Sequence, residues 1–290
     1  MTPQLAVSST PGVGGNSKGG FLKQDGSFEV EGIAPGTWQI RVEQGLMPRM
    51  ALGVAIVQID DHDVEGVSLT VHAPHLLKGV VRIEGEDKDL QAGLSLWLDS
   101  DVLNGYITTT PRKDGSFDFE NVPSGRHRVF LRGGASGQYY VKRLRYGAIE
   151  SPDTGFSLSA DGDTLEVTLS AGGARVSGVV RRDGAVGSAT PQVVLLPDTP
   201  DAEVRRYDTH LGGWDQSGAF AVKEPVRPGE YTLYAFEGVP DGAWTDAEFI
   251  KEIEGKGVRI IVGEGDAKTA EIPLIPRSDI AALLTRLGMN

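Results

Sequence analysis

Side chains that could bind a metal ion or act as acids and bases gather in one stretch of the sequence. Three aspartates surround a histidine there, and two further histidines follow: Asp60, Asp61, His62, Asp63, His72 and His75. Carboxylate and imidazole groups together are ligands for zinc. However, His72 and His75 are expected in a linker between domains, and strand residues three apart point to opposite faces. The pattern favours a solvated turn, so we predict no metal site.

A second candidate is a serine nucleophile, because residues 15–19 read Gly-Asn-Ser-Lys-Gly and match Gly-x-Ser-x-Gly. A nucleophile elbow needs a strand before the serine and a helix after it. Here a glycine-rich stretch precedes Ser17 and the next expected element is a strand. No serine, histidine and acid emerge as a set, so the sequence predicts a protein that is not an enzyme.

Two acidic pairs, Asp99 with Asp101 and Asp161 with Asp163, could offer oxygen ligands to calcium. A calcium loop supplies about six or more oxygens, and neither pair resembles one. Both pairs fit turns in which aspartate accepts backbone hydrogen bonds. We therefore expect no cofactor.

Aromatic residues are the remaining candidates, because an exposed ring can stack on a sugar or anchor a partner. Trp97 lies between Leu96 and Leu98, and strand alternation places its side chain on the outer face. The alternative is a tryptophan covered by a loop or a neighbouring domain. The other candidates for carbohydrate or partner binding are Trp244, Tyr139 and Tyr140.

Composition limits the class of protein that carries these residues. The chain has 290 residues with 39 glycines and no cysteine, and its formal charge is 28 − 40 = −12. Such an acidic chain repels nucleic-acid phosphate and anionic membrane surfaces. The longest apolar run, residues 50–57, is far shorter than the roughly 20 residues that span a bilayer. We expect no nucleic acid partner, no membrane insertion, no disulfide and no signal peptide in this chain.

An internal repeat organises the sequence into elements. Residues 25–42 recur as residues 114–131, and a looser copy runs over residues 217–233. Each copy reads as a Gly-containing turn, a strand with alternating apolar residues, a Pro-Gly or Ser-Gly turn and a second strand. In the first copy Trp38, Ile40 and Val42 form the inward row of the second strand. The repeat predicts the same hairpin three times.

Two further signals bracket the repeat and divide the chain. Gly-Val-Val-Arg at residues 79–82 and 178–181 predicts opening strands, and residues 67–71, 165–169 and 270–274 predict closing strands. The all-β fold class follows, as tandem antiparallel β-sandwiches of immunoglobulin-like or transthyretin-like type with a short C-terminal helix. The predicted domains are a truncated sandwich at 1–74, sandwiches at 75–170 and 171–276, and a tail helix at 277–290.

The first predicted domain is incomplete. Its repeat begins without a preceding Gly-Val-Val strand, and Leu5-Ala6-Val7 is assigned as the second strand. One interpretation is that the sequence starts inside a longer product, with upstream domains beyond it. The other is a groove filled by a strand from another protein chain, because a bare sheet edge invites pairing.

Two helices are expected near the C-terminus. Thr245-Asp246-Ala247-Glu248 matches a capping box and predicts a short helix to about Ile253, with Trp244 packing as its staple. Ser278 can cap a tail helix that Gly288 ends. Its apolar residues fall at helical spacing: Ile280, Leu283, Leu284 and Leu287.

These motifs together resemble a known family. The Gly-x-Val strands, Asp-Gly-x-Phe turns and Pro-Gly-x-Tyr-x-Leu at 228–233 are similar to the carboxypeptidase regulatory-like domains, as found in secreted proteins of Acidobacteria. That resemblance implies a transthyretin-like or carbohydrate-binding-like sandwich that accompanies export and has no peptidase activity of its own.

The sequence thus favours a structural or interaction protein that spaces, adheres or assembles, located outside the cell, on its surface or in the periplasm. The alternative is a carbohydrate-binding module that uses exposed aromatic rings on a polysaccharide.

Overall fold

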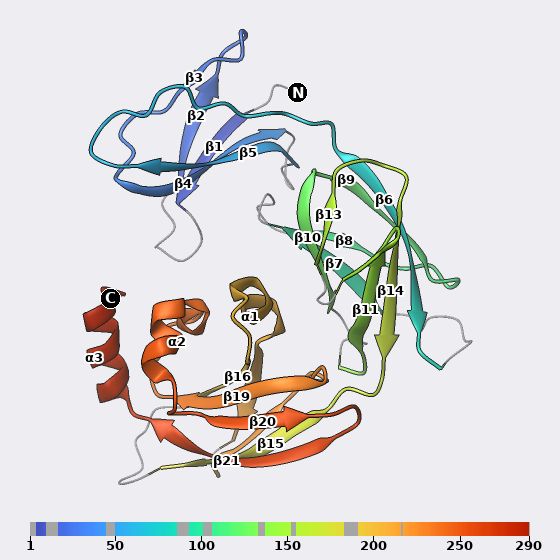
Figure 1. The fold of residues 1–290 in the computed structure, drawn as a ribbon, viewed down its shortest axis with the longest axis vertical. Helices are drawn as coiled ribbons and strands as arrows, with labels where there is room; N and C mark the ends of the chain where they lie inside the picture. The colour runs from blue at the N-terminus through green and yellow to red at the C-terminus, as the bar shows by residue number, and fades with distance from the viewer. Residues whose placement is uncertain are drawn as a thin grey trace. The chain divides into compact units, whose positions relative to one another are not determined.

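The computed structural model describes residues 4–9, 17–44, 50–85, 93–100, 106–132, 137–151, 155–182, 191–215 and 217–289. Strands greatly outnumber helices along these ranges (Figure 1). The predicted all-β class is therefore confirmed.

Contacts along the chain divide it into two compact units, residues 1–133 with 143–168 and residues 134–142 with 169–290. For the description by sheets we use three modules: the first is residues 4–71, the second 75–170 and the third 174–289. The finer division into three sandwich domains and a tail stays a prediction.

The first module is one five-stranded sheet in the order β3-β2-β1-β4-β5. Its strands are β1 (Gln4–Ser9), β2 (Ser17–Leu22), β3 (Phe28–Glu29), β4 (Gly36–Gln44) and β5 (Met50–Ile59). As predicted, the segment around Ala6 is a strand, and its Val7 pairs with Ile40 of β4. Leu5, Val7, Trp38, Ile40 and Val42 are buried as an inward row. Residues 67–71, predicted as a closing strand, form no strand, so that prediction was wrong.

The second module holds two sheets, ordered β13-β10-β7-β8 and β12-β11-β14-β6-β9. Its strands are β6 (His75–Ile83), β7 (Ser95–Ser100), β8 (Ile107–Thr109), β9 (Ser116–Val122), β10 (Gly125–Arg132), β11 (Tyr140–Tyr146), β12 (Ile149–Ser151), β13 (Gly155–Leu158) and β14 (Thr164–Ser170). The opening strand at 79–82 and the closing strand at 165–169 were both predicted, and they are neighbours in the second sheet.

The strand pairings of the third module form a closed ring. The sheet order is β16-β17-β18-β15-β21-β19-β20, and β16 also pairs with β19. The strands are β15 (Arg175–Arg181), β16 (Gln192–Pro197), β17 (His210–Trp214), β18 (Ala219–Val222), β19 (Gly229–Phe236), β20 (Val258–Val262) and β21 (Ala267–Ile275). β21 is parallel to both β15 and β19, a departure from the purely antiparallel prediction.

Helices cover the outer side of the third module: α1 (Ala202–Asp208), the 3-10 turn η1 (Ala243–Thr245), α2 (Ala247–Ile253) and α3 (Arg277–Leu287). Asp246, not Thr245, caps α2, since its carboxylate accepts the Phe249 N–H at 2.9 Å. Pro276 rather than Ser278 precedes α3, whereas Gly288 ends it at φ 66° as predicted. None of the helices along the described ranges is long and apolar enough to cross a membrane.

The repeated hairpin has one backbone design in all three modules. Glycines with φ of 83°, 85° and 86° occupy the same turn position: Gly26, Gly115 and Gly218. In the first two copies the aspartate directly before this glycine accepts a backbone hydrogen bond. Asp114, for example, accepts the Ser116 N–H at 2.9 Å. In the third copy the aspartate is Asp215, three residues before Gly218, and it accepts the Ser217 N–H at 2.8 Å. The glycine conformation therefore fixes the turn, and the capping carboxylate varies in position.

Each complete module buries the hairpin phenylalanine over a glycine of its opening strand. A Cβ added to Gly79 would lie 2.1 Å from the Phe117 ring and 2.5 Å from the Leu165 carbonyl oxygen. At Gly178 a Cβ would lie 2.9 Å from the Phe220 ring. Phe117 and Phe220 are 1% and 3% exposed. The glycine thus lets the ring and the neighbouring backbone approach the strand.

We predict that Gly79→Ala lowers the free energy of unfolding of the second module by about 2–3 kcal/mol, because overpacking displaces the ring or the backbone. Gly19→Ala is the matched control, since nothing lies within 4 Å of its added Cβ. Its effect should stay within about 0.5 kcal/mol. Urea unfolding followed by tryptophan fluorescence measures both, and equal effects would contradict the packing argument.

Candidate functional site

A side chain in each module braces the second hairpin strand against the preceding turn. It donates a hydrogen bond to the backbone carbonyl four residues earlier, and we call this contact the corner bond. The donors and acceptors are Trp38 to Ala34 at 2.8 Å, His127 to Pro123 at 2.8 Å and Tyr231 to Arg227 at 2.9 Å. The arrangement is similar to the tyrosine corner of sandwich domains.

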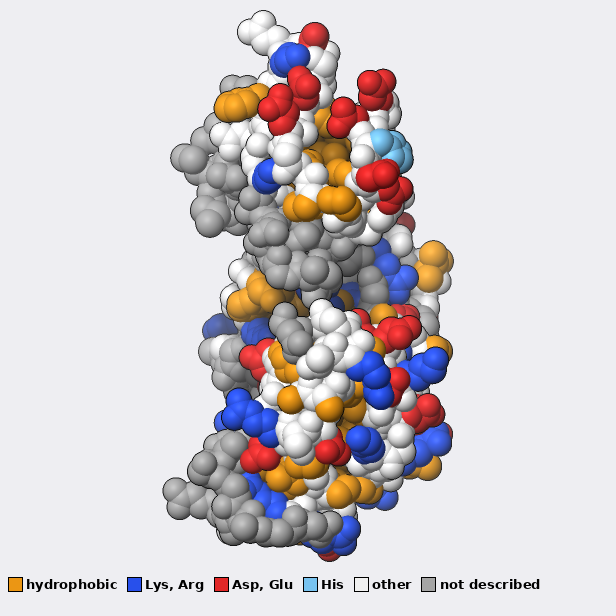
Figure 2. All heavy atoms as spheres, turned by 90° about the vertical axis from the view of Figure 1, so that its left-hand side faces the viewer, with side chains coloured by type: hydrophobic (Ala, Val, Ile, Leu, Met, Phe, Trp, Pro, Cys, Tyr) orange, Lys and Arg blue, Asp and Glu red, His pale blue; other side chains and the backbone are white. Residues whose placement is uncertain are grey.

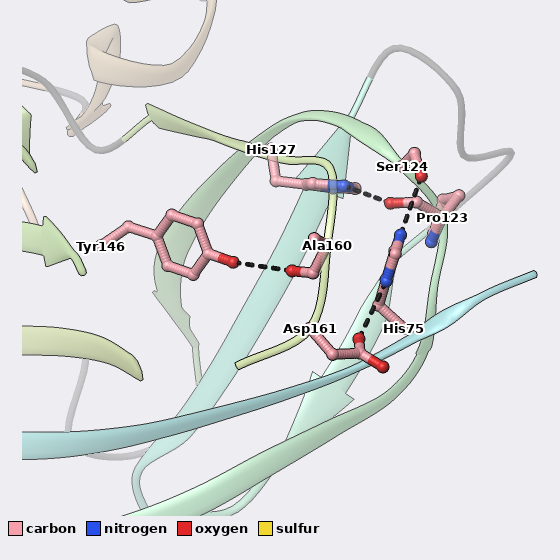
Figure 3. A network of polar contacts seen from close by, with 7 residues as sticks. All are labelled: His75, Pro123, Ser124, His127, Tyr146, Ala160 and Asp161. Carbon is pink, nitrogen blue, oxygen red and sulfur yellow. Dashed lines mark hydrogen bonds and ion pairs between the residues drawn. The ribbon is translucent and has the colours of Figure 1, made fainter. Parts of the chain in front are cut away.

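His127 makes the corner bond with an imidazole, which constrains its protonation (Figure 3). Nε2 must carry the proton that is donated to the Pro123 carbonyl oxygen. Burial lowers the pKa of His127 to about 4, with a further lowering by the charge of His75. Nδ1 is buried without a hydrogen-bond partner among the described residues. The ring is therefore neutral near pH 7 and serves the fold.

His75 lies in the same cluster and not in a linker, so the sequence interpretation was wrong for this residue (Figure 3). It begins β6, where Nδ1 contacts the Asp161 carboxylate at 2.9 Å and Nε2 contacts the Ser124 hydroxyl at 2.8 Å. The nearby Tyr146 hydroxyl donates to the Ala160 carbonyl at 3.2 Å. The two contacts of His75 tie the start of β6 to the turns that hold Ser124 and Asp161.

The other candidates for metal binding or catalysis are separate from this cluster. His62 contacts Asp61 at 3.1 Å on an exposed turn, with both side chains largely exposed. Ser17 begins β2, so a strand follows it as predicted. Asp99 accepts the Ser100 N–H, while Asp101 lies outside the described residues. Within the described ranges no three His, Cys, Asp or Glu side chains come together as a metal site.

Trp97 is the centre of an aromatic cluster on the second module. It points away from the core, half-buried, between the fully buried Leu96 and Leu98. Its ring centroid lies 5.0 Å from that of Tyr106 and 6.1 Å from that of Phe130. Phe130 is directly opposite Trp97 on β10, and Tyr106 precedes β8. We call Trp97, Tyr106, Phe130 and Arg132 the aromatic face.

Arg132 adds a positive charge to this cluster. Its guanidinium carbon lies 6.0 Å from the Trp97 ring centroid and 5.6 Å from that of Phe130, distances typical of cation–π contacts. Tyr106 is 49% exposed, and Arg132 is exposed as well. Partly exposed rings beside a cation can stack on a flat apolar face of a ligand and hydrogen-bond its polar groups.

Sequence reasoning found Trp97 but missed its three neighbours. Alternation within the repeat already places Phe130 outward, because Val129 and Leu131 point inward. The β7–β10 register that sets Phe130 opposite Trp97 depends on pairing across the sheet. Tyr106 and Arg132 gave no sequence signal of their own.

The outer face of the equivalent strand differs in each module. At the three outward positions of β4 lie Gln39, Arg41 and Glu43, with Arg41 paired to Glu43 at 3.0 Å. On β10 the equivalent positions hold Arg128, Phe130 and Arg132. On β19 they hold Thr232, Tyr234 and Phe236, of which the two aromatic rings pack with Phe249 and Ile253 of α2. The same strand positions thus hold buried polar residues in the first module, an aromatic–basic group in the second and helix-covered rings in the third.

The other three predicted binding residues are buried. Trp244 is 6% exposed and packs with Phe249 and Ile253 in the core beneath the helices. Because Asp246 is the cap, Trp244 lies two residues before it and not in the staple position that the sequence predicted. Tyr139 and Tyr140 are 7% and 8% exposed. Burial leaves little of these rings for a sugar to stack on, and Trp97 is the candidate that remains.

No family model matches the chain, and no curated protein matches it. The resemblance to carboxypeptidase regulatory-like domains therefore has no support from a family model. Solved structures give distant likenesses that include pilins. The Bacillus anthracis TIE protein shows 10% identity over 94% of this chain and 47% of that chain, at a TM-score of 0.26. This chain spans about half of that protein's length.

Two pilins match over nearly their whole length. The Streptococcal ancillary pilin shows 15% identity over 96% of this chain and 93% of its own, at a TM-score of 0.25. BcpA, the major pilin subunit of Bacillus cereus, shows 10% identity over 93% of each chain, at a TM-score of 0.23. Likenesses at these scores assign no function.

We predict that His127→Tyr removes part of the acid sensitivity of the second module. The unfolded histidine binds a proton near pH 6.5 and the folded one only near pH 4, so lowering the pH between these values favours unfolding. The wild-type chain should lose about 2–3 kcal/mol through this group by pH 4.5. Tyrosine keeps the corner bond, as Tyr231 does, without titrating in this range.

Urea unfolding of both proteins at pH 7.0 and 4.5 measures the difference. Carboxylates contribute equally to the two proteins and cancel in the comparison. The same pH dependence in wild type and His127→Tyr would contradict the assigned role of His127.

Proposed function

We propose that this chain is a non-catalytic structural and interaction protein of the cell envelope or exterior, in which tandem β-modules space or assemble other components. The observation that carries this proposal is the parallel pairing of the opening and closing strands of the third module. Seven residue pairs join β15 to β21, from Arg175 opposite Ala267 to Arg181 opposite Pro273.

This pairing determines how the module responds to tension along the chain. β15 begins at one end of the parallel ladder and β21 ends at the other, and α3 follows β21 and packs in the core of the same module. Pulling on these two points shears the strands past each other, so all the ladder hydrogen bonds resist together. In an unzipping geometry the bonds would break one after another. The first arrangement therefore suits a spacer under load.

The corner bonds support the same role. Side chains that could do chemistry elsewhere, such as His127 and Tyr231, are buried and donate to the backbone of their own module. Burial also raises the pKa of Tyr231, which keeps its hydroxyl a neutral donor. A rigid module needs such internal braces at its turns.

We predict that force applied along the chain direction meets several-fold more resistance than force applied across the ladder. The chain has no cysteine, so two introduced cysteines give unique attachment points. Arg175→Cys with Arg277→Cys loads β15 and β21 in shear, whereas Arg175→Cys with Ala267→Cys, at paired positions, unzips them. All three residues are exposed.

Optical tweezers at one loading rate compare the two proteins, since forced unfolding reports the barrier to unfolding. Higher unfolding force in the shear pair supports the spacer role. Equal forces, or a lower force in the shear pair, would overturn it.

The aromatic face favours a second candidate function, carbohydrate binding. Trp97 and Tyr106 form a partly exposed pair with Arg132 beside them, and sugar rings offer flat C–H faces to such aromatic groups. The ligand would be a polysaccharide that stacks on Trp97 and hydrogen-bonds Arg132. This function is compatible with a surface protein that adheres through one module.

We predict that Trp97→Ala weakens binding to a polysaccharide ligand at least about tenfold, as expected for a central aromatic contact. Affinity electrophoresis of the full chain against bacterial and plant polysaccharides measures it. Phe21→Ala is the matched control, because Phe21 is 90% exposed and belongs to the first module. No binding by the wild-type chain, or undiminished binding by Trp97→Ala, would exclude this candidate.

A further inference from the structure

The first module differs from the other two in how its hairpin phenylalanine is covered. Phe28 occupies the position of Phe117 and Phe220, which are 1% and 3% exposed beside the glycines of β6 and β15. Phe28 is only half-buried, and so is the next inward residue, Val30. The described part of the first module contains no strand equivalent to β6 or β15. Among the described residues, no strand glycine therefore covers the Phe28 ring as Gly79 and Gly178 cover the rings of Phe117 and Phe220.

The segment that should lie on the other side of such a strand is exposed as well. By the repeat, Val67, Leu69 and Val71 correspond to Leu165, Val167 and Leu169 of β14, which are at most 1% exposed. Val67 and Leu69 are half-buried against the first core and Val71 is 51% exposed. His72 N–H donates to the Leu52 carbonyl at 2.9 Å and holds this segment on β5. By analogy with β9 and β14, which flank β6 in the second module, β3 and residues 67–71 are the two flanks of such a strand, and both are apolar and only partly buried.

The sheet pairing and the charges around β3 indicate which kind of strand would fit beside it. β3 is the edge of its sheet, whereas its counterpart β9 pairs with β6. In that pair Lys78 lies opposite Asp118, and Glu29 is the equivalent of Asp118 in the first module. Residues 1–74 contain 4 Lys or Arg and 8 Asp or Glu, a net charge of −4. Figure 2 shows acidic side chains around exposed hydrophobic ones over the first module, at the top of the view.

We propose that the first module binds an extended β-strand of a partner protein between β3 and residues 67–71. The strand has the pattern of β6 and β15: aliphatic residues on its inward side, a glycine between them to admit the Phe28 ring, and basic residues on its outward side. This site deepens the assembly role proposed above, since it names the partner's recognition element. Main-chain hydrogen bonds would give affinity and the glycine would give specificity.

The probe is a synthetic peptide with the sequence of residues 174–182, Ala-Arg-Val-Ser-Gly-Val-Val-Arg-Arg, carrying a fluorescent label. Anisotropy titration with the full chain should show saturable binding. Hydrogen–deuterium exchange should show new protection in residues 28–30 and 67–71, with exchange in β21 unchanged. Protection in β21 would mean that the peptide replaces β15 in the third module, and this would overturn the proposal.

Two variants test the recognition rules. The peptide with Gly178→Val should bind at least tenfold more weakly, because a side chain there meets the Phe28 ring as one on Gly178 would meet Phe220. Glu29→Lys in the chain should weaken binding about threefold, because Arg175 of the peptide would lie diagonally across from residue 29, whose direct opposite is Ser177. Asp61→Lys makes the same charge change on an exposed turn and should leave binding unchanged. Binding that ignores both the glycine and Glu29 would overturn the proposal.

If the free peptide binds too weakly to measure, a fusion protein that carries the same strand tests the site. The opening and second strands are separated by 95 − 83 − 1 = 11 residues in the second module and 192 − 181 − 1 = 10 in the third. Fusing residues 174–182 ahead of Met1, with a Gly/Ser linker that leaves the same spacing before β1, should raise the Tm of the first module and slow exchange in β3. No change in either quantity would overturn the proposal.

Binding of a second copy of the chain at this site would give a different exchange result. Protection of residues 28–30 that grows with protein concentration, without peptide, would identify a second copy of the chain as the occupant and overturn the partner strand. The force measurement on β15 and β21 concerns the third module. Failure of peptide binding and failure of the spacer role can therefore be told apart.

Discussion

The contact between a phenylalanine ring and a strand glycine holds the architecture of each complete module. Phe117 over Gly79 and Phe220 over Gly178 join the hairpin to the opening strand at a distance that no Cβ allows. The opening strand is in turn the neighbour of the closing strand, so this contact brings the two ends of the module together. Where it is missing, around Phe28, residues 67–71 are not a regular strand.

The three corner bonds have the same geometry, although their donor groups differ in chemistry. Indole, imidazole and phenol each donate to the carbonyl four residues earlier, at 2.8 to 2.9 Å. The three donors are equivalent in position but not in acid–base behaviour. Only the imidazole titrates between pH 4 and 7, so the second module alone carries pH sensitivity at its corner.

The outer faces show where functions can differ on a common scaffold. Hydrogen bonding and the inward rows fix the strands, while the residues on the opposite side of each strand differ from module to module. In the first module they are buried polar side chains, such as Arg41 and Glu43. Helices cover this face in the third module, and an aromatic cluster with an arginine occupies it in the second. A β-module of this kind offers two independent surfaces for interaction: a sheet face, as around Trp97, and a sheet edge, as at β3.

Local patterns in the sequence determined the hairpins, the inward rows and most strand positions, because alternation and turn glycines act over a few residues. The C-cap of the tail helix and the packing of Trp244 under α2 followed in the same way. Tertiary structure decided what depends on distant neighbours: the parallel ladder of β15 with β21, the burial of Tyr139 and Tyr140, and the meeting of Trp97 with Tyr106 and Phe130. Residues 67–71 have the alternation of a strand, yet a strand forms only where another offers its hydrogen bonds. No local pattern contains that partner.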